Sequence, residues 1–325
     1  DYINLNSIII SKKIMLVKKL QIGIIGAGYM SNEYLKVISK NKDIECSAIF
    51  SRTIQKSEIL KKKYKIKKVF ISIDNLILSN KLDGLIVAVN ESSAFEILKK
   101  VHHIKCPILF EKPLGYNYTQ ANLINNFLKN KKNIYVALNR RFYSSTLEAK
   151  KIVDQNNGKR FIKINDQEIQ KFSKLINDNL MYANSIHLID YASIFARGKL
   201  VKVKKIKKYI KNKFHEVIVR LFFSSKDEVL YYCNWNSPGS WSVSITQENQ
   251  RCEMKPLEQL TFEKFDKDKK LQRLKIKINI NDIRYKSGLH CMVEEYIKLI
   301  KKKKNSITKF EEYFNTMKLI KAIYE

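Results

Sequence analysis

Over residues 20–138 of the 325-residue chain, short apolar runs alternate with segments of helical periodicity. Strands are predicted at 20–25, 44–50, 68–72, 83–89, 107–111 and 133–138, and helices at 29–40, 53–63, 92–102 and 119–129. This alternation is typical of an α/β fold with a doubly wound parallel sheet, because each parallel connection needs a crossover, usually a helix.

The pattern changes after residue 140. A helix is predicted at 146–154, then β-rich runs without regular helices at 161–164, 200–206, 216–223, 228–233 and 242–246, and closing helices at 289–302 and 310–324. These runs favour an α+β domain with a large, mostly antiparallel open sheet. We therefore predict two domains, 15–140 and 141–325, with Met15 as a candidate start. The status of the extension formed by residues 1–14 stays open.

The chain carries 62 Lys and Arg residues against 31 Asp and Glu, a formal net charge of +31. Only nine of the 62 are Arg, the residue favoured for bidentate recognition of phosphates and bases. We interpret the charge as compositional bias and expect no nucleic-acid partner, because no helix-turn-helix, zinc or RNA-recognition signature occurs. A nucleic-acid-binding protein is the alternative, and steeply salt-dependent DNA binding would reveal it.

The five Cys residues are scattered without a Cys-x-x-Cys pair, and the five His residues show no metal-ligand spacing. This pattern predicts neither a disulfide framework nor a metal site, and it favours a reducing, cytoplasmic environment. No apolar run approaches the ~18 residues that a membrane-spanning helix needs, so no membrane partner is expected.

A glycine motif, Gly26-Ala27-Gly28-Tyr29-Met30, follows the first predicted strand and opens the first predicted helix. Gly26 allows a tight turn, Gly28 lets a pyrophosphate approach the backbone, and the helix offers free N–H groups to phosphates. The motif therefore predicts a dinucleotide-binding site. The alternative is a tight turn that holds no ligand.

The second predicted strand ends at Ser51-Arg52-Thr53, without the acid that usually contacts the ribose of NAD. Arg52 is suited to the 2′-phosphate of NADP, and Ser51 and Thr53 carry donors for the same group. NADP(H) is therefore the favoured cofactor, and NAD(H) remains possible. The structural alternative is a solvated Arg52 in a lysine-rich chain.

Two further positions are suited to proton transfer. Lys112 follows the fifth strand, at the carboxyl edge where open α/β sheets bind ligands, and burial lowers the pKa of a lysine toward that of a general acid or base. His187 and Asp190 lie three residues apart and share a face if their segment is helical. The alternatives are a simple Lys112-Pro113 turn and a core histidine.

Four motifs occur in order: Gly-Ile-Ile-Gly-Ala-Gly-Tyr-Met at 23–30, Glu-Lys-Pro-Leu-Gly at 111–115, Asn-Arg-Arg-Phe at 139–142 and His-Leu-Ile-Asp at 187–190. With this combination the chain resembles the glucose–fructose oxidoreductase / inositol dehydrogenase (Gfo/Idh/MocA) family. The resemblance implies an N-terminal Rossmann domain and a C-terminal domain whose open sheet often forms the contact of a homo-oligomer, a dimer or tetramer. It also implies an NAD(P)-dependent dehydrogenase or reductase that acts on a sugar, nucleotide sugar or cyclitol.

The resemblance also assigns roles to residues. Lys112 and His187 match catalytic positions, and Glu111 and Lys112 also belong to the cofactor-side wall. Two sets complete the predicted site: Ala88, Val89 and Asn90 at the cofactor, and Arg140, Arg141, Asn184, His187 and Asp190 at the substrate.

One departure from the family concerns position 183, where Ala183 replaces an Asp that many members carry. Retained lysine and histidine with that loss resemble members acting on nucleotide sugars or other surface-polysaccharide precursors. Three alternatives stay open: an interdomain ion pair for Arg140 and Arg141, a sheet-core role for Trp235 and Trp241, and a non-catalytic sensor or regulator with the same fold.

Overall fold

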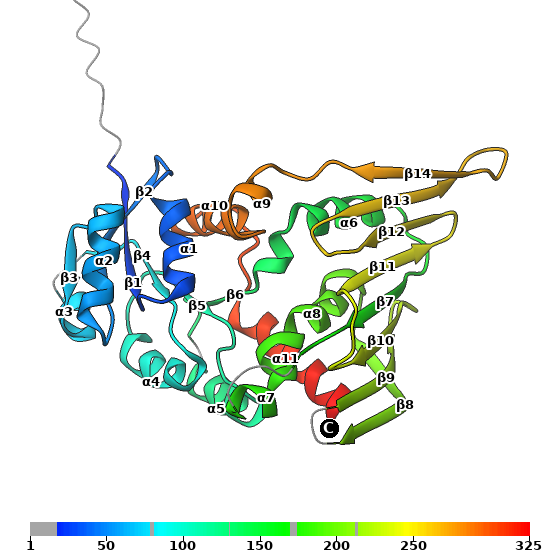
Figure 1. Ribbon diagram of the computed structural model, residues 1–325, viewed down its shortest axis with the longest axis horizontal. Coiled ribbons are helices and arrows are strands. Elements are labelled where there is room, and N and C mark those ends of the chain that lie inside the picture. Colours follow the sequence, from blue (N-terminus) through cyan, green and yellow to red (C-terminus); the bar gives the residue numbers. More distant parts are fainter. Residues whose placement is uncertain (1–17, 79–80, 130, 170–173, 212–213) are drawn as a thin grey trace, which may run out of the picture.

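The computed structural model describes residues 18–78, 81–129, 131–169, 174–211 and 214–325. The predicted extension 1–14 and Met15 therefore lie outside the described residues. Two sheets occupy opposite ends of the molecule, with helices around the first sheet and between the two (Figure 1).

Sheet A contains six parallel strands in the order β3-β2-β1-β4-β5-β6. Their bounds are Leu20–Ile25 (β1), Ile44–Phe50 (β2), Lys68–Phe70 (β3), Gly84–Val87 (β4), Ile108–Glu111 (β5) and Ile134–Ala137 (β6). They coincide with the predicted strands because central parallel strands are buried on both faces and so form continuous apolar runs. The strand order reverses between β1 and β4, where ligands bind in open sheets of this kind.

Helices cover both faces of sheet A. On one face lie α1 (Tyr29–Ile38), α2 (Ile54–Tyr64) and α10 (Leu289–Ile300). On the other lie α3 (Ile73–Leu78), α4 (Glu91–Val101) and α5 (Tyr118–Phe127). The chain thus returns to the first sheet after building the second: the Tyr296 hydroxyl of α10 donates to the Pro107 carbonyl at 2.7 Å.

Sheet B contains eight strands in the order β14-β13-β12-β11-β7-β10-β9-β8. All pairs are antiparallel except β7 with β10, as expected for a mostly antiparallel sheet. The strands are Phe161–Asp166 (β7), Leu200–Lys211 (β8), Phe214–Phe223 (β9), Glu228–Asn234 (β10), Ser242–Gln247 (β11), Gln250–Met254 (β12), Leu260–Phe265 (β13) and Leu271–Ile276 (β14).

The remaining elements are η1 (Asn139–Phe142), α6 (Ser144–Asp154), α7 (Lys174–Asp178), the π-helix η2 (Met181–Ser185), α8 (Ile186–Phe195), α9 (Asn281–Arg284) and α11 (Phe310–Tyr324). The core of sheet B forms where α6, α8 and α11 pack against one face of its strands. Helix α11 runs through the middle of the molecule and also contacts α5 of the first half (Figure 1).

Two parts of the second half differ from the predicted elements. Residues 174–195, for which a helix was considered only around 187–190, contain α7, η2 and α8; eight of the ten α8 residues are buried, so its sequence shows no polar face. Strands β12, β13 and β14 were not predicted. Their outward positions carry ion pairs such as Arg251–Glu253 and Arg273–Glu263, which dilute the hydrophobic alternation that marks a strand.

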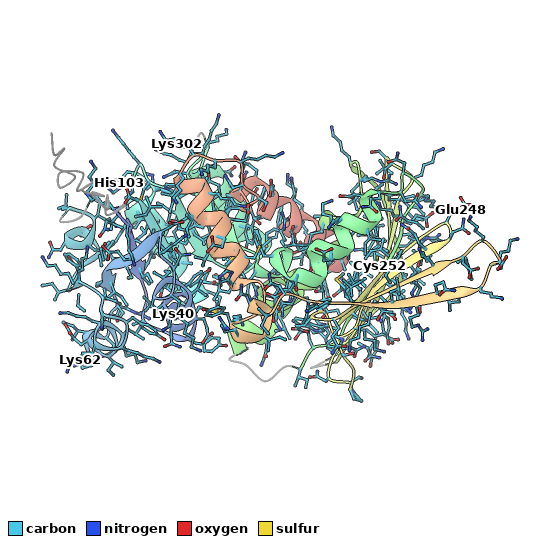
Figure 2. All side chains as sticks on the ribbon, turned by 90° about the horizontal axis from the view of Figure 1, so that it is seen from above. Lys40, Lys62, His103, Glu248, Cys252 and Lys302 are labelled. Atoms are coloured by element: carbon cyan, nitrogen blue, oxygen red, sulfur yellow. The ribbon has the colours of Figure 1, made fainter. Side chains whose placement is uncertain are left out.

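The surface of the described part adds three observations. Exposed lysines lie on different sides of the part of the molecule that contains sheet A, as Lys62 and Lys302 show (Figure 2). The five cysteines are free thiols, and no group of three metal-ligating side chains forms among the described residues. No helix within the described ranges has both the length and the apolar character needed to cross a membrane.

Candidate active site

Three loops at the carboxyl edge of sheet A enclose a pocket of about 320 Å³. They follow β1, β2 and β4, the strands next to the reversal of strand order. The pocket collects nine of the predicted cofactor residues: Gly26, Ala27, Gly28, Ser51, Arg52, Thr53, Ala88, Val89 and Asn90. It also contains Lys56 and Ser93, which the sequence did not single out.

Glycine is suited to positions 26 and 28 of this pocket for different physical reasons. Gly26 has φ +112°, and a Cβ there would overlap the Ala88 carbonyl oxygen, so only glycine fits between the β1 and β4 loops. A Cβ on Gly28 would meet nothing within 4 Å. Gly28 therefore faces open space at the N-terminus of α1, where the free N–H groups of the first turn are available to an anion.

The donor set of the pocket fits a dinucleotide. Arg52 and Lys56 supply two exposed cations at the β2 end, and no acidic side chain is among the described residues that line the pocket. Ser51 is less available than expected, since its hydroxyl donates to the Thr53 carbonyl at 2.7 Å and lies 2.8 Å from the Ser57 hydroxyl. The cations, rather than the serine, suit a phosphate at this end.

The other predicted cofactor residues lie outside this pocket. Tyr29 is 66% exposed, and the Lys286 ammonium lies 5.4 Å from its ring centre. Met30 is partly buried against the core on the α1 side of sheet A. Glu111 ends β5 and accepts a hydrogen bond from the Tyr34 hydroxyl at 2.7 Å, and burial raises its pKa.

Lys112 follows β5 and points toward the second half of the molecule. Its Nζ donates to the Ala183 carbonyl of η2 at 2.6 Å. Burial, followed by the nearby charge of Arg140, lowers the pKa of Lys112 to about 8. The lysine is therefore poised to gain or lose a proton near neutral pH.

His187 lies in the first turn of α8 with 4% of its surface exposed. Burial lowers its pKa well below the usual range, and the charges of Arg140, Lys112 and Lys286 act in the same direction. The imidazole is therefore neutral at physiological pH, and its buried Nδ1 has no hydrogen-bond partner among the described residues.

Of the two predicted arginines, Arg140 lies within electrostatic reach of Lys112 and His187. Its guanidinium carbon lies 4.4 Å from the ring centre of Trp241, and its buried Nε has no hydrogen-bond partner among the described residues. Trp241 is itself held by a hydrogen bond from Nε1 to the Gln167 carbonyl at 2.8 Å. Trp235 is fully buried, as the core alternative expects, and Trp241 packs against the same core while its ring also faces Arg140.

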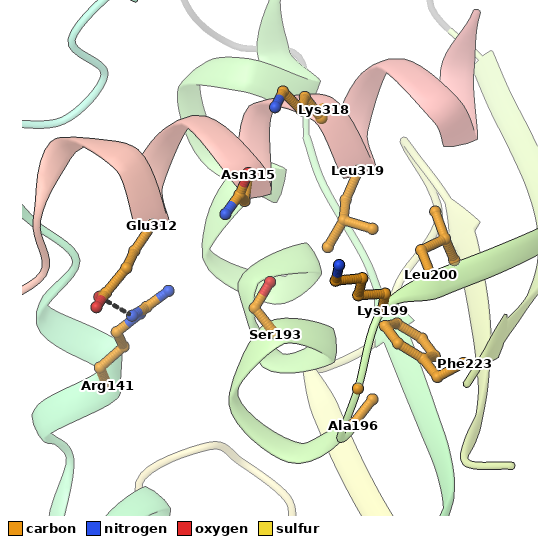
Figure 3. A pocket seen from close by; sticks show the side chains of 11 residues that line it. Arg141, Ser193, Ala196, Lys199, Leu200, Phe223, Glu312, Asn315, Lys318 and Leu319 are labelled. Atoms are coloured by element: carbon orange, nitrogen blue, oxygen red, sulfur yellow. Dashed lines mark hydrogen bonds and ion pairs between the residues drawn. The ribbon is translucent and has the colours of Figure 1, made fainter. Parts of the chain in front are cut away.

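Arg141 and Asp190, both predicted substrate residues, bond to each other. The guanidinium donates to both Asp190 carboxylate oxygens at 2.7 Å, and the Thr316 hydroxyl donates to the same carboxylate at 2.7 Å. Arg141 also pairs with Glu312 of α11 at 3.1 Å, at the wall of a separate cavity of about 710 Å³ (Figure 3). The ion pairs therefore link η1, α8 and α11 within the second predicted domain, rather than joining the two domains as the structural alternative proposes.

Sequence reasoning missed two acids at the end of β7. Asp166 and Glu168 are both buried, and burial is the main cause that raises the pKa of each carboxyl group. Both oxygens of Glu168 lie 2.9 Å from Nδ2 of Asn184, a predicted substrate residue. The available signal was Asp-Gln-Glu at the end of a strand in an acid-poor chain. Only the folded structure shows that Glu168 lies within electrostatic reach of Lys112.

These features define a dinucleotide-binding α/β protein with lysine, histidine and arginine side chains beside its cofactor pocket. Residues 20–139 match the model of the GFO_IDH_MocA family, described as an oxidoreductase family with an NAD-binding Rossmann fold. This match confirms, over the N-terminal domain, the resemblance to the Gfo/Idh/MocA family drawn from the motifs.

Solved structures share this fold over almost the whole chain. Dehydrogenase MviM from Clostridium difficile has 20% identity and a TM-score of 0.78, covering 94% of this chain and 98% of its own. A protein described as an NADPH-dependent oxidoreductase from Desulfitobacterium hafniense DCB-2 has 16% identity and a TM-score of 0.79, covering 94% of each chain. UDP-N-acetylglucosamine 3-dehydrogenase GnnA from Acidithiobacillus ferrooxidans has 10% identity and a TM-score of 0.75, covering 94% of this chain and 97% of its own. A search of curated proteins finds no match.

Proposed function

We propose that this protein is an NADP(H)-dependent dehydrogenase or reductase that acts on a hydroxyl or keto carbon of a sugar, nucleotide sugar or cyclitol. The observation that carries the proposal is the placement of Lys112. It follows β5, beside the β4 loop of the dinucleotide pocket, with a pKa lowered to about 8. Neutral His187 and the cationic Arg140 lie within its electrostatic reach.

The chain's own residues account for the proton. In the oxidative direction, uncharged Lys112 accepts the hydroxyl proton while the carbon gives up a hydride and a C=O bond forms; the ammonium returns the proton in the reductive direction. When bound, the nicotinamide supplies the acceptor or donor of that hydride. Neutral His187 is suited to a hydrogen bond with the same substrate oxygen, because its Nδ1 is unpartnered in the described structure.

The cofactor preference follows from the β2 end of the pocket. Arg52 and Lys56 line it, and the acid that would favour the ribose hydroxyl of NAD is missing after β2. A 2′-phosphate would gain charge-assisted hydrogen bonds from these cations, whereas a 2′-hydroxyl would gain little. This difference supports NADP(H) over NAD(H).

Arg140 supports a substrate that carries an anionic group. A guanidinium lying on an aromatic ring, with its Nε free of partners in the described part of the chain, is suited to a phosphate or carboxylate. A nucleotide sugar, such as a surface-polysaccharide precursor, provides a diphosphate. The fold shared with UDP-N-acetylglucosamine 3-dehydrogenase GnnA is compatible with this substrate class.

The outer face of sheet B supports a homo-oligomer. Helices α6, α8 and α11 pack on the inner face, whereas five apolar side chains of the outer face keep partial exposure: Phe161, Ile218, Phe222, Leu230 and Tyr232. A second copy of the chain would bury them, so sedimentation or light scattering should give a dimer or tetramer.

A turnover screen tests the proposed function. Nucleotide sugars, hexoses and cyclitols are assayed with NADP+ and NADPH by nicotinamide absorbance. We expect turnover of at least one substrate by the wild type and none by Lys112→Ala. Saturable NADPH binding without turnover of any compound would favour the alternative, a sensor or regulator with the same fold.

A further inference from the structure

Lys112 lacks a direct carboxylate partner in the described structure. The one hydrogen bond recorded for its Nζ goes to the neutral Ala183 carbonyl, in the π-helical turn Met181–Ser185. A carbonyl orients an ammonium but carries no full charge to stabilise it. The arrangement of this turn therefore decides where the lysine points.

Glu168 holds the residue next to that carbonyl. Nδ2 of Asn184 lies 2.9 Å from both Glu168 oxygens, while Ala183 presents its carbonyl to Lys112. The amide and carboxyl groups thus connect the end of β7 to the π-helical turn. Deviations of this kind within helices often mark functional positions, because they redirect backbone groups.

The segment that carries Glu168 is fixed by the loop between β10 and β11. The Asn236 N–H donates to the Glu168 carbonyl at 2.6 Å, and Trp241 Nε1 donates to the neighbouring Gln167 carbonyl at 2.8 Å. Glu168 itself is only 5% exposed. Its carboxyl group is therefore held in place beside the site rather than solvated.

Electrostatics couple the same groups. The charge of Glu168 raises the pKa of Lys112, and the charge of Lys112 lowers that of Glu168, although burial dominates both. The other charged groups that act on this pair come from β5, α4, η1 and the end of β7: Glu111, Glu91, Arg140 and Asp166. Two further groups complete the cluster: His187 of α8, on which Lys112 acts, and Lys286 of the α9–α10 loop, which acts on His187 and Glu111.

We infer that Glu168 is a positioning residue for proton exchange at Lys112, acting through Asn184 and the Ala183 carbonyl. The effect of this residue on turnover rests on the proposed function. Glu168 supplies a buried carboxyl group where position 183 has none, and it acts from the segment that follows β7. Because two neighbouring groups then share the titration, the pH dependence belongs to the Lys112–Glu168 pair.

The experiment compares Glu168→Gln, Glu168→Ala and Asn184→Ala with the wild type. Glu168→Gln keeps an acceptor for Asn184 but removes the charge, whereas the two Ala variants break the link. Glu96→Gln is the matched control, since Glu96 is an exposed carboxylate of α4 that pairs with the exposed Lys99. We expect kcat to fall about tenfold or more in both Ala variants, with KM for NADP(H) within about twofold of the wild type.

The pH readout separates positioning from simple packing. In Glu168→Gln the oxidative kcat profile should become a single ionisation with its midpoint at lower pH, because the carboxylate that stabilised the Lys112 ammonium is gone. Glu96→Gln should leave the profile unchanged. An unchanged profile in Glu168→Gln, together with unchanged kcat in both Ala variants, would overturn the inference.

A second readout works without turnover. The pH dependence of Lys112 acetylation by acetic anhydride, followed by mass spectrometry of its peptide, reports the lysine's titration directly. A shift to lower pH in Glu168→Gln supports the inference, and superimposable curves for Glu168→Gln and wild type refute it. If the wild type neither binds NADP(H) nor turns over, the proposed function fails, and the labelling still decides the role of Glu168.

Discussion

The dinucleotide pocket and the lysine site differ in how they are built. The pocket consists of three short loops of one parallel sheet, and its central features are backbone groups around Gly26 and Gly28. The lysine site consists of side chains from separated segments, brought together by β5, η1, the end of β7, η2 and α8. Local sequence is therefore enough to specify the first, whereas the second depends on tertiary packing.

This difference determines how each region should respond to mutation. A pocket made of backbone tolerates changes in most side chains but not in the glycine that φ and a close carbonyl require. A site made of interacting side chains should lose function at single positions, with consequences spread over its neighbours. The following predictions measure that contrast.

The largest effect is expected for Lys112→Ala. Removal of a positioned acid or base should lower kcat by about 10²–10⁴-fold, while NADPH affinity stays within a few-fold because Lys112 does not line the dinucleotide pocket. Steady-state kinetics and fluorescence titration measure the two quantities. Wild-type turnover in this variant would remove Lys112 from the proposed mechanism.

Asp190→Ala tests whether the Arg141–Asp190 pair is structural. Loss of the carboxylate leaves a largely buried guanidinium with Glu312 as its remaining ion-pair partner in the described structure, and should cost about 3–5 kcal/mol of unfolding free energy. Urea unfolding measures this loss, and Lys99→Ala, which breaks an exposed pair, should cost less than about 1 kcal/mol. A stable variant with a greatly raised substrate KM would restore Asp190 to the substrate site.

Arg52→Ala should separate the two cofactors. Loss of a charge-assisted contact to the 2′-phosphate should weaken NADPH binding about tenfold and NADH binding less than twofold. Lys56→Ala should act in the same direction, whereas Lys62→Ala, on the same helix but outside the pocket, should change neither. Equal losses for both cofactors would mean that Arg52 does not contact the phosphate.

The smallest effect is the pH dependence of the wild type. Because the pKa of Lys112 is lowered to about 8, the uncharged base becomes more abundant as pH rises through that value. The oxidative kcat should therefore rise by up to about tenfold between pH 7 and 9, and the reductive kcat should fall over the same range. Flat profiles in both directions would indicate that another group carries the proton.

Much of the fold could be predicted from the sequence because its strongest signals are local. The central strands of sheet A are buried on both faces, and helix α11 has the bounds 310–324 expected from its periodicity. Helix α8 and strands β12–β14 could not be predicted in the same way. Helix α8 is buried on nearly every side, and strands β12–β14 place charged side chains outward.

The candidate site shows the same division. The glycine loop and Arg52 lie together because each follows a strand of one parallel sheet. Arg140 and Arg141 are adjacent in sequence but separate in space: one lies on Trp241, and the other pairs with Asp190. No local pattern distinguishes them, and none places Glu168 beside Asn184.

The most direct test of the central claim is a fluorescence titration of the wild-type protein with NADPH and with NADH at two salt concentrations. We expect saturable binding of one dinucleotide per chain, tighter for NADPH, with a preference that weakens as salt screens Arg52 and Lys56. Absence of saturable binding to either dinucleotide would contradict the account, because the pocket between the β1, β2 and β4 loops would then not be a cofactor site.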